Sequence, residues 1–122
     1  VNAIDRLNLK SDWAFYLDEN VRGGLGAALE FGLINFVFQK VGSEKLNCEV
    51  IETNEAVVKL HKKFGFVEEG FRRENIIKNE NRMGVFFLGL TKLDWEREKE
   101  TVKIRYEKVI DKFDLEIEYE PA

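Results

Sequence analysis

Cysteine is almost absent from this chain of 122 residues, which contains a single one, Cys48. An internal disulfide is therefore excluded, and no metal site is expected. We predict that Cys48 is buried as a small hydrophobic residue in a strand. Long apolar runs are also missing, so no segment is predicted to span a membrane. A signal-peptide pattern is not found, which favours a cytoplasmic location.

An excess of positive charge is the second feature that the sequence lacks. Lysine and arginine number 19 against 23 aspartates and glutamates, which gives a net charge of -4. This balance argues against nucleic acid as the main partner. Repeats, low-complexity linkers and a second globular domain are not found. We expect a main part at residues 1–92 and a charged, helical C-terminal extension at residues 93–122, with a homodimer left open.

The order of hydrophobic patterns predicts a layered α/β fold with helices packed on a mixed sheet. Two strands, at residues 1–10 and 13–17, are predicted to pair antiparallel across a turn at residues 10–12. A helix follows at about residues 24–40, with Gly42 suited to a left-handed cap. The remaining predicted elements are a strand at 45–52, a helix from Asn54 to Gly65, and strands within 66–77 and at 82–90 joined by a turn at 78–81. Gly89 is predicted to weaken the last strand.

The charged tail, residues 94–122, carries a helical stripe followed by a short alternating stretch. We interpret it as a solvated helix packed on the domain, with a partner-binding helix as the alternative, and then a short edge strand. The stripe consists of Val102, Tyr106, Val109, Ile110 and Phe113, and the alternation of Leu115, Ile117 and Tyr119.

A glycine-rich turn stands between the second predicted strand and the first predicted helix. Its sequence is Arg22-Gly23-Gly24-Leu25-Gly26. Glycines let a backbone approach a ligand closely, and the free amides at a helix start attract anions. The order strand, glycine turn, helix therefore indicates a site for a phosphate-bearing cofactor, with a purely structural turn as the alternative.

The second predicted helix supplies the more specific pattern, NEAVVKLHKKFGF. Asn54 lies seven residues before His61 and eleven before Gly65-Phe66. Together with the glycine turn, this block resembles the GNAT acetyltransferase superfamily, whose pattern there is Asn, a small residue, Leu-Tyr and Gly-Phe. The chain departs from that pattern with Val57 at the small position, with His61 at the tyrosine position, and with a glycine loop that is one residue shorter.

The resemblance covers roughly residues 1–90 and is strongest to nucleotide-sugar amine acetyltransferases of the pseudaminic acid pathway. Ribosomal-protein N-terminal acetyltransferases are the next nearest. The superfamily's first strand and the helices over its acceptor site have no counterpart here, so we expect that the chain lacks the front part of the fold. A GNAT-like fold implies a mostly antiparallel sheet flanked by helices, and acetyl-CoA as the acetyl donor.

The resemblance also implies roles for particular residues. The backbone amide of Leu17 would polarise the thioester carbonyl, and His61 would protonate the departing CoA thiolate in place of tyrosine. A half-buried histidine that only packs is the alternative for His61. The implied cofactor-binding residues are Phe15, Leu17, Arg22, Gly23, Gly24, Gly26, Ala27, Asn54 and Val57. The alternative for Asn54 is an ordinary N-cap of the second predicted helix.

The general base and the acceptor are less defined. Tyr16, Asp18 and Glu19 lie near the position expected for the base, although Asp18 and Glu19 also fit ordinary turn residues. A water molecule or a base in the missing front part of the fold is the alternative. Cationic side chains of the last hairpin suit an anionic acceptor such as a nucleotide-linked amino sugar, with edge-strand solubility as the alternative explanation: Arg72, Arg73 and Arg82. Lys62 and Lys63 suit the adenosine phosphates, or are ordinary surface lysines. Acetylation of a protein N-terminus and a non-catalytic CoA-binding module remain the alternative functions.

Overall fold

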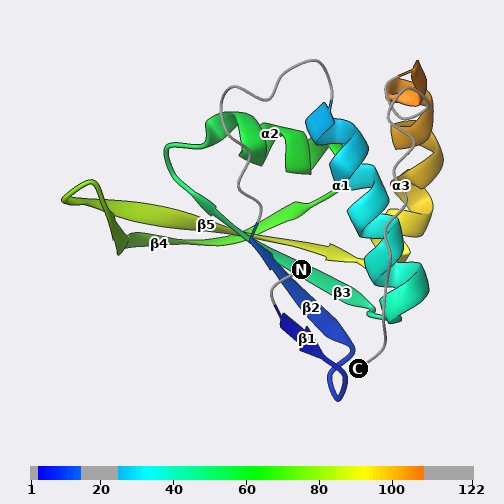
Figure 1. The fold of residues 1–122 in the computed structure, drawn as a ribbon, viewed down its shortest axis with the longest axis horizontal. Coiled ribbons are helices and arrows are strands. Elements are labelled where there is room, and N and C mark those ends of the chain that lie inside the picture. The colour runs from blue at the N-terminus through cyan, green and yellow to red at the C-terminus, as the bar shows by residue number, and fades with distance from the viewer. Residues whose placement is uncertain (1–2, 15–24, 109–122) are drawn as a thin grey trace.

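A five-stranded sheet carries three α-helices in the computed structural model, which describes residues 3–14 and 25–108 (Figure 1). The strand order is β1-β2-β3-β5-β4. Only β2 and β3 run parallel, and the other neighbours are antiparallel. This arrangement confirms the predicted mixed, mostly antiparallel sheet flanked by helices. The elements are β1 (Ala3–Asp5), β2 (Lys10–Ala14), α1 (Leu25–Asn35), the π-helix η1 (Phe36–Val41), β3 (Lys45–Ile51), α2 (Glu55–Lys63), β4 (Val67–Lys78), β5 (Asn81–Thr91) and α3 (Lys92–Arg105).

The turn between β1 and β2 differs from the prediction. Strand β2 already begins at Lys10, so the predicted turn at residues 10–12 is wrong and the chain turns at residues 6–9 instead. The Asp5 carboxylate accepts hydrogen bonds from the backbone and side-chain nitrogens of Asn8, at 3.0 and 2.9 Å, and Leu9 adopts a φ of 52°. These local contacts close the turn earlier than strand patterning suggests. The antiparallel pairing of β1 with β2 is as predicted.

The first helix ends with a wider turn than an α-helix has. Helix α1 continues directly into η1, so the helical segment covers the predicted range. Gly42 follows with a φ of 82°, and its amide donates to the carbonyl of Val37. A left-handed conformation costs a residue with a Cβ far more than it costs glycine. The prediction that Gly42 is a left-handed cap is confirmed.

One hydrophobic core joins the sheet to all three helices. Alternate residues of β3 are buried because successive side chains of a strand point to opposite faces. Their neighbours in the core come from the helices and from β5, and α1 lies between α2 and α3 (Figure 1). Helix α3 therefore packs on the same core as the rest, through Trp95 and Val102. The core includes Ile34, Val37, Leu46, Cys48, Val50, Val57, Phe64, Leu88, Leu90, Trp95 and Val102. Predicted features beyond residue 108, from Val109 to Tyr119, lie outside the described residues.

The β4–β5 hairpin extends beyond the rest of the sheet (Figure 1). Its two-residue turn is made by Asn79 and Glu80, with φ values of 51° and 66°, within the predicted residues 78–81. Strand β3 pairs with β5 only as far as Ile51 opposite Val85. Glu52 still exchanges hydrogen bonds with the backbone of Gly84, and beyond Gly84 the two strands pair only with each other among the described residues. Every side chain from residue 71 to 82 is exposed. The outer hairpin, residues 72–82, is thus a projecting arm.

Candidate active site

The candidate site lies where the parallel strands β2 and β3 lead toward the starts of α1 and α2. The described ladder between the two strands runs from Lys10 opposite Lys45 to Ala14 opposite Glu49. Residues 15–24, which connect β2 to α1, lie outside the described residues. They include the predicted site residues Phe15, Leu17, Arg22, Gly23 and Gly24, and the candidate bases Tyr16, Asp18 and Glu19. Their roles stay predictions.

Gly26 and Ala27 form the first turn of α1 together with Leu25. Gly26 is buried, and Ala27 packs in the hydrophobic core with 4% of its surface exposed. The first turn carries no acidic side chain. A carboxylate at this position would compete with a bound anion for the free amides of a helix start. The local charge is therefore compatible with the predicted phosphate contact.

Asn54 occupies the predicted position between β3 and α2. Its backbone carbonyl accepts hydrogen bonds from the amides of Val57 and Val58, at 3.1 and 3.2 Å, and thereby opens the helix. Its side chain, in contrast, makes no capping hydrogen bond among the described residues. The position of the N-cap is confirmed, but the side-chain amide is not used for capping. Val57, the other predicted contact on this helix, is 5% exposed and belongs to the core.

His61 is completely buried and contacts the carboxylate of Glu30. The ring nitrogen Nδ1 faces Oε1 of Glu30, and the side chains of both residues have no exposed surface. The Phe66 ring lies 5.1 Å from the imidazole, between ring centroids. The pair thus joins α1 to α2 in the interior. Sequence reasoning singled out His61 and missed Glu30.

A signal for Glu30 was present in the sequence. Between residues 25 and 39 the sequence has one charged residue, Glu30, in an otherwise mostly apolar segment. An acidic residue on the apolar face of a helix needs a partner, because a lone buried carboxylate is costly. The pattern could therefore have indicated a buried pair, although it does not identify His61 as the partner.

Burial controls the electrostatics around this pair. It raises the pKa of the Glu30 carboxyl, an effect that the nearby His61 opposes. Burial also raises the pKa of the Cys48 thiol, and the negative charge of Glu30 adds to that shift. Cys48 is 1% exposed and stays protonated, and the prediction of a buried small hydrophobic residue in a strand is confirmed.

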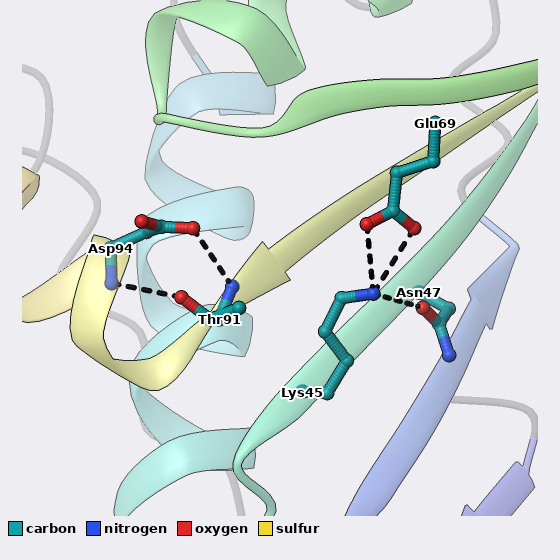
Figure 2. Close-up of polar contacts among 5 residues, drawn as sticks. All are labelled: Lys45, Asn47, Glu69, Thr91 and Asp94. Carbon is teal, nitrogen blue, oxygen red and sulfur yellow. Dashed lines mark hydrogen bonds and ion pairs between the residues drawn. The ribbon is translucent and has the colours of Figure 1, made fainter.

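A second polar cluster lies on the sheet face turned away from the core (Figure 2). The ammonium group of Lys45 on β3 donates to both carboxylate oxygens of Glu69 on β4 and to Oδ1 of Asn47, each at 3.0 Å. Strand β5 runs between β3 and β4, and its residue at the crossing is Gly89. Gly89, predicted as a weak point, therefore gives this ion pair its space.

The cationic residues near the site differ in their surroundings. Lys62 forms an ion pair with Glu68 at 3.2 Å, and the Lys63 carbonyl accepts from Arg105 at 3.1 Å. The Arg72 guanidinium lies over the Phe87 ring, 5.0 Å from its centroid. Arg73 and Arg82 are exposed on the outer hairpin. Arg72 therefore has its side chain held against the sheet.

The described part of the chain has neither a metal-ligating cluster nor a helix that could span a membrane. No group of three histidine, cysteine, aspartate or glutamate side chains there could hold a metal ion. None of the helices in residues 3–14 and 25–108 is long and apolar enough to cross a membrane.

Comparisons with known proteins agree with this geometry. The family model described as an acetyltransferase (GNAT) domain matches residues 2–83. No curated protein matches significantly. Among solved structures, mutant forms of the spermidine/spermine N-acetyltransferase SpeG from Vibrio cholerae superpose with a TM-score of 0.72 at 20% identity, over 79% of this chain and 56% of theirs. A chimera of Vibrio cholerae SpeG with hSSAT gives 0.70 at 20%, over 76% and 57%.

A structure titled as a probable acetyltransferase gives a TM-score of 0.68 at 23% identity, over 75% of this chain and 52% of that one. The chain therefore spans a little over half the length of these solved structures. At such identities the similarity shows the fold.

Proposed function

The chain belongs to the GNAT acetyltransferase family, and from this premise we propose that it transfers an acetyl group from acetyl-CoA to a primary amine. Acetyl-CoA is the acetyl donor of this family. The observation that carries the proposal is the family match over residues 2–83, which includes both the glycine-rich turn and the helix of Asn54 and His61.

The cofactor would bind along the carboxyl ends of β2 and β3. Its pyrophosphate would meet the backbone amides of residues 22–27, with the Arg22 guanidinium adding a positive charge. Each exposed contact between an anion and a helix start contributes about 0.3–1 kcal/mol, so several are needed together. The absence of an acidic side chain in the first turn of α1 supports this position. Asn54, with a side chain that does not cap α2 among the described residues, would contact the pantetheine arm together with Phe15 and Val57.

The chemistry requires three events. The amine nitrogen attacks the thioester carbonyl, and negative charge develops on the carbonyl oxygen, which the amide of Leu17 would stabilise. The carbon–sulfur bond then breaks with its electron pair going to sulfur. The thiolate takes a proton, for which His61 is our candidate donor, and the amine loses one to a base among residues 16–19 or to water.

The acceptor that we propose is an amino sugar carried on a nucleotide diphosphate. Between residues 72 and 82 the projecting arm carries four cationic side chains and two acidic ones. Arg72 is held against Phe87, so its guanidinium is ordered for a charged ligand. The solved neighbours include spermidine acetyltransferases, but a polyamine is a cation and would meet this arm with charge of the same sign.

The test is acetyl transfer to three acceptors at equal concentration: a UDP-4-amino-4,6-dideoxy sugar, spermidine and a basic peptide. Release of CoA is followed with a thiol reagent, and thermal shift with CoA is measured in parallel. We expect transfer to the UDP-amino sugar. Transfer to spermidine or the peptide alone would overturn the acceptor assignment. Thermal stabilisation by CoA without transfer to any amine would overturn the proposed enzymatic function and favour a CoA-binding module.

A further inference from the structure

The buried contact between Glu30 and His61 has no role in the proposed chemistry so far. We propose that Glu30 is a positioning residue, which holds the His61 ring and fixes the nitrogen that gives up a proton. This inference rests on the proposed function of His61 as a proton donor.

The geometry supports a fixed ring. Nδ1 of His61 faces Oε1 of Glu30, and both side chains have no exposed surface, so water does not compete for either group. The Phe66 ring packs against the imidazole at 5.1 Å between centroids. Because the two residues come from α1 and α2, their contact also fixes one helix against the other.

The contact is poorly explained by packing alone. Within the described residues, Oε2 of Glu30 is buried without a hydrogen-bond partner. A buried charged pair usually stabilises a fold no better than apolar side chains of the same volume, and an unsatisfied carboxylate oxygen adds a cost. A role for the carboxylate in proton transfer accounts for its presence.

The proton balance follows from this contact. When the imidazole is charged, the Nδ1 proton is donated to Glu30, so the proton that reaches the CoA sulfur comes from Nε2. The carbon–sulfur bond breaks, its electron pair goes to sulfur, and the sulfur takes this proton. A neutral ring remains with its proton on Nδ1, still held by Glu30. The amine loses one proton in the same cycle and Nε2 takes one up, so the proton balance closes.

Other titratable groups around the pair do not take over this role. Cys48 faces Glu30 from β3, and Tyr106 faces it from the residue after α3. Burial raises the pKa of both groups, so both are neutral at pH 7. The carboxylate therefore supplies the negative charge next to the ring.

His61 is the one histidine in the sequence, which makes a direct test available. Long-range 1H–15N spectra of the labelled full chain report which ring nitrogen carries a proton. We expect Nδ1 to be protonated at pH 7 in the wild type and in Glu30→Gln, which keeps an acceptor oxygen. In Glu30→Met, which removes the acceptor at similar volume, the Nδ1 proton should be lost from the neutral ring. An unprotonated Nδ1 in the wild type would overturn the inference even if no variant folds.

Turnover is the second measurement, with the UDP-amino sugar, spermidine and the basic peptide as probes. Glu30→Met should lower kcat about tenfold or more and change its pH profile, while KM for acetyl-CoA stays within about twofold. Glu30→Gln should recover part of the loss, and Glu96→Met, an exposed change on α3, serves as the control. Wild-type kcat and pH profile in Glu30→Met would overturn the positioning role and leave the proposed function intact. If the wild type transfers acetyl to none of the probes, the proposed function and the catalytic part of this inference are both overturned. In that case the spectra still show whether Glu30 holds the ring.

Discussion

The carboxylate of Glu69 occupies the space where a side chain on Gly89 would be. A Cβ built on Gly89 would lie 2.5 Å from the carboxylate carbon and both carboxylate oxygens of Glu69. The carboxylate crosses β5 at this point and pairs with Lys45 on β3 (Figure 2). The ion pair between Glu69 and Lys45 therefore depends on a third residue, Gly89, which has no side chain to block it.

This relationship predicts coupling between positions 69 and 89. Gly89→Ala removes the conformational cost of a strand glycine, about 0.5–1 kcal/mol, but forces the carboxylate away from Lys45. An exposed pair contributes about 0.2–1 kcal/mol. We expect the change in the free energy of unfolding caused by Gly89→Ala to be more favourable in the Glu69→Ala protein than in the wild type. The expected difference between the two changes is about 0.5 kcal/mol. Urea unfolding of the four proteins measures the difference, and additive effects would contradict it.

Gly42 is predicted to tolerate an added side chain sterically but not conformationally. No atom lies within 4 Å of a Cβ built there, yet its φ is 82°. We therefore expect Gly42→Ala to lower the free energy of unfolding by about 1–2 kcal/mol, which is the cost of a left-handed residue with a Cβ. Gly42→Asn should lose less, since asparagine tolerates this conformation better. Equal stability of Gly42→Ala and the wild type would contradict the prediction.

The start of α3 is predicted to lose stability in acid. Thr91 Oγ1 accepts from the Asp94 amide at 3.0 Å, and the Thr91 amide donates to Asp94 at 3.4 Å (Figure 2). The hydrogen bond from Thr91 lowers the pKa of the Asp94 carboxyl. A carboxyl whose pKa is lower in the folded state stabilises the fold at pH values above its unfolded pKa of about 3.9. This stabilisation is lost as the pH falls through the folded-state pKa.

We therefore expect the advantage of the wild type over Asp94→Asn to be full at pH 7 and to shrink below about pH 4. Thr91→Ala should cost about 1 kcal/mol at pH 7. Urea unfolding at pH 7 and pH 3 measures both effects. A difference between wild type and Asp94→Asn that does not change with pH would exclude the carboxylate as its source.

His61 substitutions separate chemistry from packing. His61→Phe alone leaves Glu30 as an unpaired buried charge, which typically destabilises by about 3–5 kcal/mol. His61→Gln keeps an amide donor for Glu30 but supplies no proton to a thiolate. We expect His61→Gln to fold and to lose about a hundredfold or more in kcat, with KM for acetyl-CoA within about twofold. The double variant His61→Phe with Glu30→Leu, which removes the whole pair, should be equally slow. Wild-type turnover in either folded variant would eliminate His61 as the proton donor.

Much of the fold could be predicted from local patterns. Alternation in residues 45–52, the glycines at 42 and 65, and the two-residue turn at 79–80 each determine one local conformation, and the structure has all of them. The turn before β2 lies earlier than predicted because hydrogen bonds that Asn8 donates to the Asp5 carboxylate, rather than strand propensity, set its position.

The contacts that join distant segments were not predictable in the same way. Glu30 and His61 are 31 positions apart, and their pairing depends on how α1 packs beside α2. Glu69 reaches Lys45 only because of the register shift between Glu68 and Gly70 in β4, which no single-strand pattern reveals. Sequence periodicity therefore indicates that a face is buried, whereas the partner across that face follows from the tertiary arrangement.

The projecting arm, residues 72–82, can change its charge pattern independently of the hydrophobic core. Its two strands pair only with each other among the described residues, and its side chains are exposed. Substitutions there leave the interior packing untouched, so their thermodynamic effect is confined to the arm. Evolution can therefore change the charges of the arm, and with them any acceptor preference that the arm confers under the proposed function, without lowering the stability of the domain.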